Sequence, residues 1–374
     1  MDNLVKVFIA GDFCCCPSTA NVFVSQELKT LISDADISIC NFETPLKPDG
    51  MNPVKGRLYN NDDVPDFLRG LGFDMFILAN NHAFDYGIAG YDKTVKALNG
   101  YCFGAGNYDE AYKVFVVNQK GKKIGFLALC FAANNGVFDS FSNKEGKGVA
   151  WIGDARVNHI IEDAKENVDY LIVLPHDGIE YIDAPLPEIK NRYRDFIDYG
   201  ADAVIASHPH CPQGWEKYKG CPIFYSLGNF YFNSKKDYSY RATNRPHWYE
   251  GMCLVLNIGG SSMDIRIVHT KNIDNVSLVV DHSQERSDHL KRLCSYLENE
   301  NEYAKYMRSL SDMNGTEFRN IEKYVILRYA NKYLPGFIKK KLAGRLNNIE
   351  LIRLMKNDTR RNFFLYHLLN NNRV

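Results

Sequence analysis

The run Met75-Phe76-Ile77-Leu78-Ala79-Asn80-Asn81-His82 is an apolar stretch that ends abruptly in three polar side chains. Consecutive apolar residues bounded in this way are typical of a buried β-strand. In α/β proteins the loops at the carboxyl ends of such strands form the ligand site. The run therefore predicts a strand at residues 75–79 that delivers two carboxamides and an imidazole to one edge of a sheet.

Four other predicted strands end in polar side chains of similar kinds. They supply Asp12 after residues 5–10, Asn41 and Glu43 after residues 37–40, His176 after residues 171–175, and His208 and His210 after residues 203–206. Taken singly, an Asp in such a place is commonly a turn or N-cap residue, and a lone His is commonly a satisfied buried side chain. Together they predict a shared metal or polar catalytic site, because carboxylate, carboxamide and imidazole groups suit Mn, Fe or Zn.

Strands and amphipathic helices alternate along the chain as far as about residue 270. Further strands are predicted at residues 123–130, 223–226 and 252–258, and helices at residues 25–33, 91–98, 156–167 and 186–199. Alternation of this kind predicts an α/β fold in which helices cover a sheet.

The composition is that of an ordinary globular protein, since 45% of the 374 residues are hydrophobic and 24% are charged. Lys plus Arg and Asp plus Glu both number 45, and this zero net charge argues against a nucleic-acid partner. No apolar run approaches the roughly 18–20 residues that span a bilayer, and residues 1–13 lack the features of a secretory signal, so we expect a cytoplasmic protein. The ten cysteines include no CxxC pair and are expected to be reduced thiols rather than structural zinc ligands.

The chain changes character near residue 285, where helical periodicity takes over. We therefore expect an α/β domain at residues 1–280 and a helical, basic C-terminal region at residues 281–374. Helices are predicted within residues 286–310 and 317–331. Residues 321–374 hold 12 Lys and Arg against 3 Asp and Glu, so the C-terminal region is basic and the remaining chain is acidic.

Apolar residues recur every four positions within this basic region, at Leu334, Ile338, Leu342 and Leu346. Lys and Arg fill the positions between them, so residues 334–355 predict a basic amphipathic helix. One hypothesis is peripheral contact with the anionic inner face of the membrane. The alternative is that the apolar stripe packs on the α/β domain and leaves its charges in water.

The motifs resemble those of a known family. In chain order they are AGD, NFE, LANNHAFDYG, HDGIEY, SHPHCPQGWE and IFYSLGNF, from about residue 5 to about residue 260. This series resembles the CapA family of capsule and poly-γ-glutamate synthesis proteins, which is similar to a branch of the calcineurin-like metallophosphoesterases. The resemblance implies a four-layer α/β/β/α sandwich with a centre of one or two divalent ions, Mn, Fe or Zn, at the strand ends.

The same resemblance implies a role for each motif residue. Asp12 and His210 would bind a first metal, and Glu43 would bridge two metals. A second metal would be bound by Asn81, His176 and His208. His82, beside Asn81, would protonate a leaving group or hold the substrate.

Three positions depart from the family patterns. Cys14 stands where the superfamily places a metal-binding His, so the first site lacks an imidazole unless the Cys14 thiolate substitutes. The bridging residue is Glu43 rather than an Asp, and Asp177 occupies a position that is often Trp. These departures favour the second metal site over the first and leave a mononuclear centre as an alternative.

Several neighbouring residues are candidates for substrate contact or for positioning. Asp85 would either orient His82 through a ring nitrogen or cap the following helix. Lys55 and Arg57 would either grip an anionic substrate or lie on a solvated loop. The remaining candidates for substrate contact are Asn41, Glu180 and Asn229.

These observations predict a metal-dependent, phosphoesterase-like hydrolase of capsule polysaccharide or poly-γ-glutamate synthesis. Its substrate would be an anionic polymer or a phosphoester, and its partners would belong to the capsule-synthesis machinery. One alternative is a non-catalytic polymer-binding or scaffold component, and another is a structural metal-binding domain whose tail recruits partners. The Asn81–His82 pair favours the hydrolase, because a structural module has little need of a free imidazole beside a metal.

Overall fold

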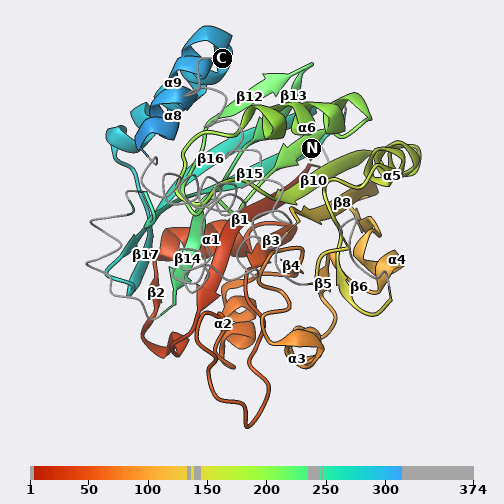
Figure 1. Cartoon of the computed structure of the whole chain (residues 1–374), viewed down its shortest axis with the longest axis vertical. Coiled ribbons are helices and arrows are strands. Elements are labelled where there is room, and N and C mark those ends of the chain that lie inside the picture. The colour runs from red at the N-terminus through yellow and green to blue at the C-terminus, as the bar shows by residue number, and fades with distance from the viewer. Residues whose placement is uncertain are drawn as a thin grey trace, which may run out of the picture.

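The computed structural model describes residues 4–132, 136–138, 145–234, 245, 247–260 and 262–313 (Figure 1). Its strands are β1 Val5–Cys15, β2 Phe23–Val24, β3 Ile37–Phe42, β4 Met75–Ile77, β5 Cys102–Phe103, β6 Ala105–Gly106, β7 Phe115–Gln119, β8 Lys122–Cys130, β9 Gly148–Val149, β10 Tyr170–His176, β11 Ala203–Ile205, β12 Trp215–Tyr218, β13 Cys221–Phe224, β14 Asn229–Asn233, β15 Glu250–Gly259, β16 Ser262–Ile273 and β17 Ser277–Val280. Its helices are η1 Thr19–Asn21, α1 Gln26–Ser33, α2 Val64–Leu71, α3 Gly87–Ala97, α4 Tyr108–Ala111, α5 Arg156–Lys165, α6 Pro187–Asp198, α8 Gln284–Glu298 and α9 Glu300–Met313.

Two large mixed sheets form the body of the molecule. The first has the order β2-β17-β16-β15-β1-β3-β4-β5, with β14 pairing alongside β1, and the second has the order β12-β13-β11-β10-β8-β7. Strands β1, β3, β4 and β5 are parallel, as are β8, β10, β11 and β13. The carboxyl ends of these parallel strands gather the polar motifs at one edge.

The inner faces of the two sheets pack against each other. Val7 and Ile9 of β1 belong to one buried cluster with Phe126 of β8 and Ile172 of β10. Phe8, between the two β1 residues, points to the other face, as the two-residue period of a strand requires. Both faces of these strands are buried, which explains why the sequence there is apolar without alternation.

Helices cover the outer face of each sheet. Leu28 of α1 and Leu68 of α2 pack in one cluster with Phe8 of the first sheet. On the second sheet, Ile161 of α5 and Phe196 of α6 are buried. The resulting order of layers is α/β/β/α, so the predicted fold class is confirmed.

Every strand and helix predicted between residues 5 and 260 is present, but some boundaries differ. Strands β1 and β3 are longer than predicted, so Asp12 and Asn41 lie within strands rather than after them. The sequence reading missed α2, although Pro65 at its start and the left-handed Gly72 at its end are helix signals. All ten cysteines are free thiols, as expected.

The C-terminal helices α8 and α9 confirm the helical pattern at residues 286–310. Lys190 of α6 is buried, and its ammonium group donates to Glu300 Oε1 at 2.8 Å and to the Leu297 carbonyl at 3.2 Å. The Tyr303 hydroxyl donates to the Pro185 carbonyl at 2.6 Å. These contacts join the helix pair to the α/β body, while the division at residue 280 stays a prediction.

The predicted helices at residues 317–331 and 334–355 lie outside the described residues. Within the described residues, no helix combines the length and the apolar character needed to cross a membrane.

An irregularity in β1 brings the first motif to the edge of the sheet. The register between β1 and β3 shifts between Ala10 and Asp12, and the Asp12 N–H donates to the Gly228 carbonyl at 3.2 Å. A Cβ atom on Gly11 would lie 2.0 Å from that carbonyl oxygen. Gly228 itself has a φ of 69°, in the left-handed region that favours glycine. The two glycines therefore allow β14 to approach β1 beside Asp12.

We expect Gly11→Ala to lower the free energy of unfolding by about 1–3 kcal/mol, because its Cβ must displace the Gly228 backbone. Gly70→Ala is the matched control, since Gly70 lies on the exposed side of α2 with nothing near the added Cβ. It should instead raise stability by up to about 1 kcal/mol. Urea unfolding followed by circular dichroism measures both, and a neutral Gly11→Ala would contradict the close approach.

Candidate metal centre

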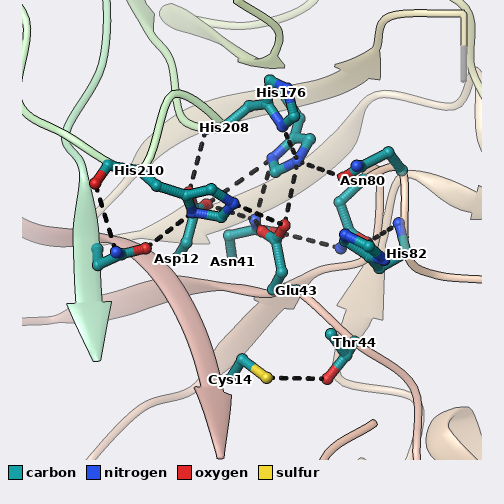
Figure 2. Close-up of polar contacts among 12 residues, drawn as sticks. Asp12, Cys14, Asn41, Glu43, Thr44, Asn80, His82, His176, His208 and His210 are labelled. Carbon is teal, nitrogen blue, oxygen red and sulfur yellow. Dashed lines mark hydrogen bonds and ion pairs between the residues drawn. The ribbon is translucent and has the colours of Figure 1, made fainter. Parts of the chain in front are cut away.

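Two buried carboxylates form the base of the site. Asp12 comes from β1 and Glu43 directly follows β3, and neither side chain is exposed. Asn41 Nδ2 lies between them and donates to Asp12 Oδ1 at 2.7 Å and to Glu43 Oε2 at 2.8 Å (Figure 2). The pairing of β1 with β3 is what places the two acidic groups on one amide.

Three imidazoles lie against this carboxylate pair. His176 ends β10, and its Nδ1 is 3.8 Å from Asp12 Oδ1 while its Nε2 is 3.6 Å from Glu43 Oε1. His210 Nδ1 is 3.5 Å from Asp12 Oδ2, and its Nε2 is 3.9 Å from Glu43 Oε1. His208 Nδ1 is 3.2 Å from His176 Nε2. The two sheets thus contribute opposite halves of a single cluster.

The backbone that carries His208 and His210 is strained. Their φ angles are 107° and 58°, values that side-chain-bearing residues adopt only where the surroundings enforce them. The His208 N–H donates to Asp12 Oδ2 at 3.1 Å, and the Tyr181 N–H donates to the Pro209 carbonyl at 2.8 Å. These bonds hold the loop so that both imidazoles face the carboxylates.

The carboxamides of the ANNH motif complete the cluster. Asn81 Oδ1 is 2.9 Å from His176 Nε2. Asn80 Nδ2 donates to Asn41 Oδ1 at 3.1 Å, and Asn80 Oδ1 accepts from the His82 N–H at the same distance. Asn80 therefore links the second and third motifs and orients the backbone at His82.

Burial and nearby charges shift the pKa values of Asp12 and Glu43 in opposite directions. Burial, followed by the nearby Glu43 charge, raises the pKa of Asp12 to about 8. Burial alone would raise the pKa of Glu43 as well, but the charge and hydrogen bond of His176 together with the charges of His210 and His82 lower that pKa to about 2. His176 shows the converse: burial would lower its pKa, and the Glu43 charge raises it. Negative charge this deeply buried requires cationic partners.

The donor set fits divalent metal ions. Two groups have ligand atoms within 4.8 Å of one another, Asp12 with Glu43 and His176, and Glu43 with His208 and His210. Glu43 Oε1 belongs to a buried side chain and has no hydrogen-bond partner among the described residues. Buried polar atoms are normally satisfied, so this oxygen is suited to a cation shared by both groups. Oxygen and nitrogen donors of this kind suit Mn, Fe or Zn.

His82 is held by Asp85. Its Nδ1 lies 2.8 Å from Asp85 Oδ2, which also accepts from the Leu58 N–H at 2.7 Å. Burial alone would lower the pKa of His82, but the hydrogen bond to Asp85 and the charges of Asp85, Glu43 and Glu180 together raise it to about 9. Helix α3 has no side-chain cap at Tyr86, so Asp85 contacts His82 and does not cap the helix.

The remaining candidates for substrate contact differ in where they lie. Asn229 Oδ1 is 2.9 Å from His210 Nδ1, at the rim of the cluster. The Glu180 carboxylate is near enough for its charge to raise the pKa of His82 and to oppose the burial that lowers the pKa of His210. Lys55 and Arg57 are exposed on the preceding loop and make no side-chain hydrogen bond with the described residues. The structure therefore brings Asn41, Glu180 and Asn229 to the cluster. The Lys55 and Arg57 side chains lie on an exposed loop and do not join it.

Two departures from the family pattern, Cys14 and Asp177, lie outside the groups of potential metal ligands among the described residues. Cys14 is buried beside Thr44, whose hydroxyl is 3.6 Å from its Sγ, and burial raises the pKa of its thiol. It belongs to neither group of potential ligands found around Glu43 in the described residues. Asp177 Oδ1 accepts from the Gly178 N–H at 2.8 Å, so this carboxylate contacts its own loop.

Aromatic residues beside His210 were missed in the sequence reading. The Trp248 ring lies 4.9 Å from the His210 ring, centroid to centroid, and Tyr181 lies 6.3 Å from it. The Arg245 guanidinium lies 4.0 Å from the centre of the Tyr181 ring. Tyr181 follows Glu180 in a quoted motif and was within reach of sequence reasoning, whereas nothing local marks Trp248 or Arg245.

The fold is a sandwich of two helix-covered sheets that carries carboxylates, carboxamides and imidazoles at its strand ends. A model of one family, described as bacterial capsule synthesis protein PGA_cap, matches residues 11–234. The chain belongs to this family.

Similar proteins include two capsule or polymer synthesis proteins. The capsule biosynthesis protein CapA of Bacillus anthracis is 30% identical over 224 residues, which cover 56% of this chain and 54% of the relative. The PGA biosynthesis protein CapA of Bacillus subtilis (strain 168) is 29% identical over 229 residues, which cover 56% and 57%. The chain thus matches only about half the length of these curated relatives. Among solved structures, a phosphatase from Mycoplasma pneumoniae gives a TM-score of 0.40 at 13% identity, covering 74% of this chain and 97% of that chain.

We expect His176→Ala and His208→Ala each to lower the metal content of the purified protein, because each removes an imidazole that faces the carboxylates. His159→Ala is the matched control: this His lies exposed on α5 beside Glu162. Elemental analysis after dialysis against Mn²⁺, Fe²⁺ or Zn²⁺ gives the number of ions per chain. Equal metal content in all three variants and the unsubstituted protein would refute the assignment.

Proposed function

We propose that the chain is a metal-dependent hydrolase of the phosphoesterase type that acts in the synthesis of a bacterial capsule polymer. The observation that carries this proposal is the His82–Asp85 pair, at 2.8 Å, beside a buried cluster of metal-ligand side chains. A purely structural metal site has no use for an imidazole held next to it by a carboxylate. The membership of the family supports the link to capsule synthesis.

The proposed metal ligands are the six residues that the motifs supply, Asp12, Glu43, Asn81, His176, His208 and His210. Glu43 is the proposed bridge, since its orphaned Oε1 lies near both His176 and His210. When bound, divalent cations at such a site activate a water and neutralise charge on the transferring group.

His82 is the proposed proton donor to the leaving group. The protonated ring donates through Nδ1 to Asp85, and its second proton, on Nε2, is the one available to a substrate. The hydrogen bond to the Asp85 carboxylate raises the pKa of His82 and so favours the protonated ring that a general acid requires. Asp85 is a positioning residue, because it contacts His82 and also fixes the loop at Leu58.

The proposed substrate is an anionic polymer or a phosphoester. Asn41 lies between the two carboxylates, Glu180 and Asn229 lie beside the imidazoles, and the exposed Lys55 and Arg57 supply positive charge on a loop whose Leu58 N–H donates to Asp85. The basic region after residue 321 is the proposed contact with capsule-synthesis partners or with the inner face of the membrane, with residues 334–355 as the contacting helix.

A specific observation also favours the non-catalytic alternative. The position of a superfamily metal ligand is taken by Cys14, which lies beside Thr44. In the ligand assignment that the family resemblance implies, the first site would then depend on Asp12, Glu43 and His210 alone. A protein with one weakened metal site could bind a polymer without cleaving it. Activity measurements decide between the two functions.

We expect His82→Ala to retain its metal and to lose hydrolytic activity by about 10²–10⁴-fold, the usual contribution of a general acid. Asp85→Asn should lower activity less and move the basic limb of the pH profile to lower pH, because a general acid must be protonated and the pKa of His82 falls without the Asp85 carboxylate. The assay uses aryl phosphomonoesters and phosphodiesters and a γ-glutamyl peptide as probes. His159→Ala serves as the control of unchanged activity.

Loss of metal in His82→Ala would identify His82 as a ligand instead. Full activity in that variant would remove its catalytic role, and a metal-loaded protein inactive on every probe would favour the polymer-binding function.

A further inference from the structure

A second cluster of metal-ligand side chains lies outside the candidate centre. Asp183 comes from the loop between β10 and α6, His247 precedes β15, and His289 belongs to α8. One ligand atom from each of the three lies within 4.8 Å of the others, and all three side chains are half-buried. The three segments are far apart in the sequence, so their convergence is a property of the fold.

Two of the three side chains are oriented by other residues. His247 Nδ1 lies 2.7 Å from Glu250 Oε2, with the Arg286 guanidinium farther away at 3.5 Å. A neutral ring that donates through Nδ1 presents a lone pair on Nε2, which is the usual arrangement of a metal-binding His with a carboxylate behind it. Asp183 Oδ1 accepts from the Tyr306 hydroxyl at 2.7 Å, which leaves Oδ2 for another partner.

The third side chain has a buried nitrogen with no partner. His289 Nε2 finds no hydrogen-bond partner among the described residues, while its Nδ1 receives an Arg292 N–H at 2.7 Å. The rings of His289 and His247 are stacked, with centroids 4.4 Å apart and planes at 17°. Buried polar atoms are normally satisfied by a partner. A metal ion near this nitrogen, the second imidazole and the Asp183 carboxylate would supply one.

We propose that Asp183, His247 and His289 bind a divalent transition metal of the zinc type, separate from the centre at Glu43. Two imidazoles and one carboxylate are an established donor set for such ions, with a water in the remaining position. Bonds near 2.0–2.2 Å require the ligand atoms to move closer than they are now, which side-chain rotation of the stacked rings provides.

Binding at His289 also requires a shift of the ring proton. Nε2 must offer a lone pair, so the neutral ring carries its proton on Nδ1, and Arg292 can no longer donate there. Arg292 is exposed on α8 and is free to turn into solvent. The other nearby guanidinium, Arg286, pairs with Glu250, Asp281 and Glu285, so its charge is already balanced.

This second metal would brace the wall of the first centre. His247 precedes Trp248, whose ring lies 4.9 Å from the His210 ring and whose carbonyl accepts from Asn229 Nδ2 at 2.9 Å. Asp183 follows Tyr181, which flanks the same His210. A metal held also by His289 would tie both segments to α8.

The experiment compares His247→Ala and His289→Ala with Arg292→Ala in a His176→Ala/His208→Ala background that weakens the first centre. Zn²⁺ and Co²⁺ are added to the full chain, and calorimetry, elemental analysis and Co²⁺ absorption count the ions. The background protein and Arg292→Ala should bind one ion that His247→Ala and His289→Ala do not bind. Excess Zn²⁺ should raise the melting temperature of the background protein and of Arg292→Ala only, because a ligand that binds the folded state stabilises it.

Each remaining outcome overturns the proposal. Equal ion counts and equal Zn²⁺-induced shifts in all four proteins would show that the cluster binds no metal. Loss of Zn²⁺ binding in Arg292→Ala as complete as in His247→Ala and His289→Ala would show that the His substitutions do not act by removing ligands. If His289→Ala fails to fold by circular dichroism, Asp183→Asn replaces it, and unchanged Zn²⁺ binding in that variant counts against the site.

Discussion

The hydrogen bonds from Asn41 Nδ2 to both Asp12 and Glu43 are the contact on which the site depends. Two carboxylates buried without exposure repel each other, and their close approach is tolerated only where donors and cations face them. The amide supplies the donors, and the imidazoles of His176 and His210 lie on the far side. The whole sandwich can be understood as the frame that holds these groups together.

The frame meets that requirement with backbone features as well as side chains. Gly11 lets β14 approach β1, where the Asp12 N–H reaches the Gly228 carbonyl. The strained backbone at His208 and His210 turns two imidazoles toward the carboxylates, and Asp12 itself accepts from the His208 N–H. Asp12 is therefore both a potential ligand and part of the support for the opposite loop, so the site and the fold are coupled through one side chain.

Local sequence patterns were enough to predict most strands and helices and the members of the cluster, because apolar runs and strand-end polar residues are adjacent in the chain. The four-layer arrangement was implied only by the family resemblance. They could not decide between roles that depend on distant partners. Asp85 was open between a helix cap and a partner of His82, and only the packed structure shows it between His82 and Leu58. Likewise β14 pairs with β1 through a close approach of two glycines, which no periodicity reveals. Asp183, His247 and His289 carry no motif at all.

The contacts of α8 and α9 bear on how the basic region can act. Lys190, buried against Glu300 and the Leu297 carbonyl, attaches this helix pair to α6, and α8 carries His289 to the segment that precedes Trp248. Trp248 in turn packs on His210. A displacement of the chain beyond Met313 would therefore act first on α9 and α8, and then on Trp248 beside His210. Packed side chains thus run from α9 through α8 to the candidate metal centre, and any partner contact proposed for the basic region would reach that centre along them.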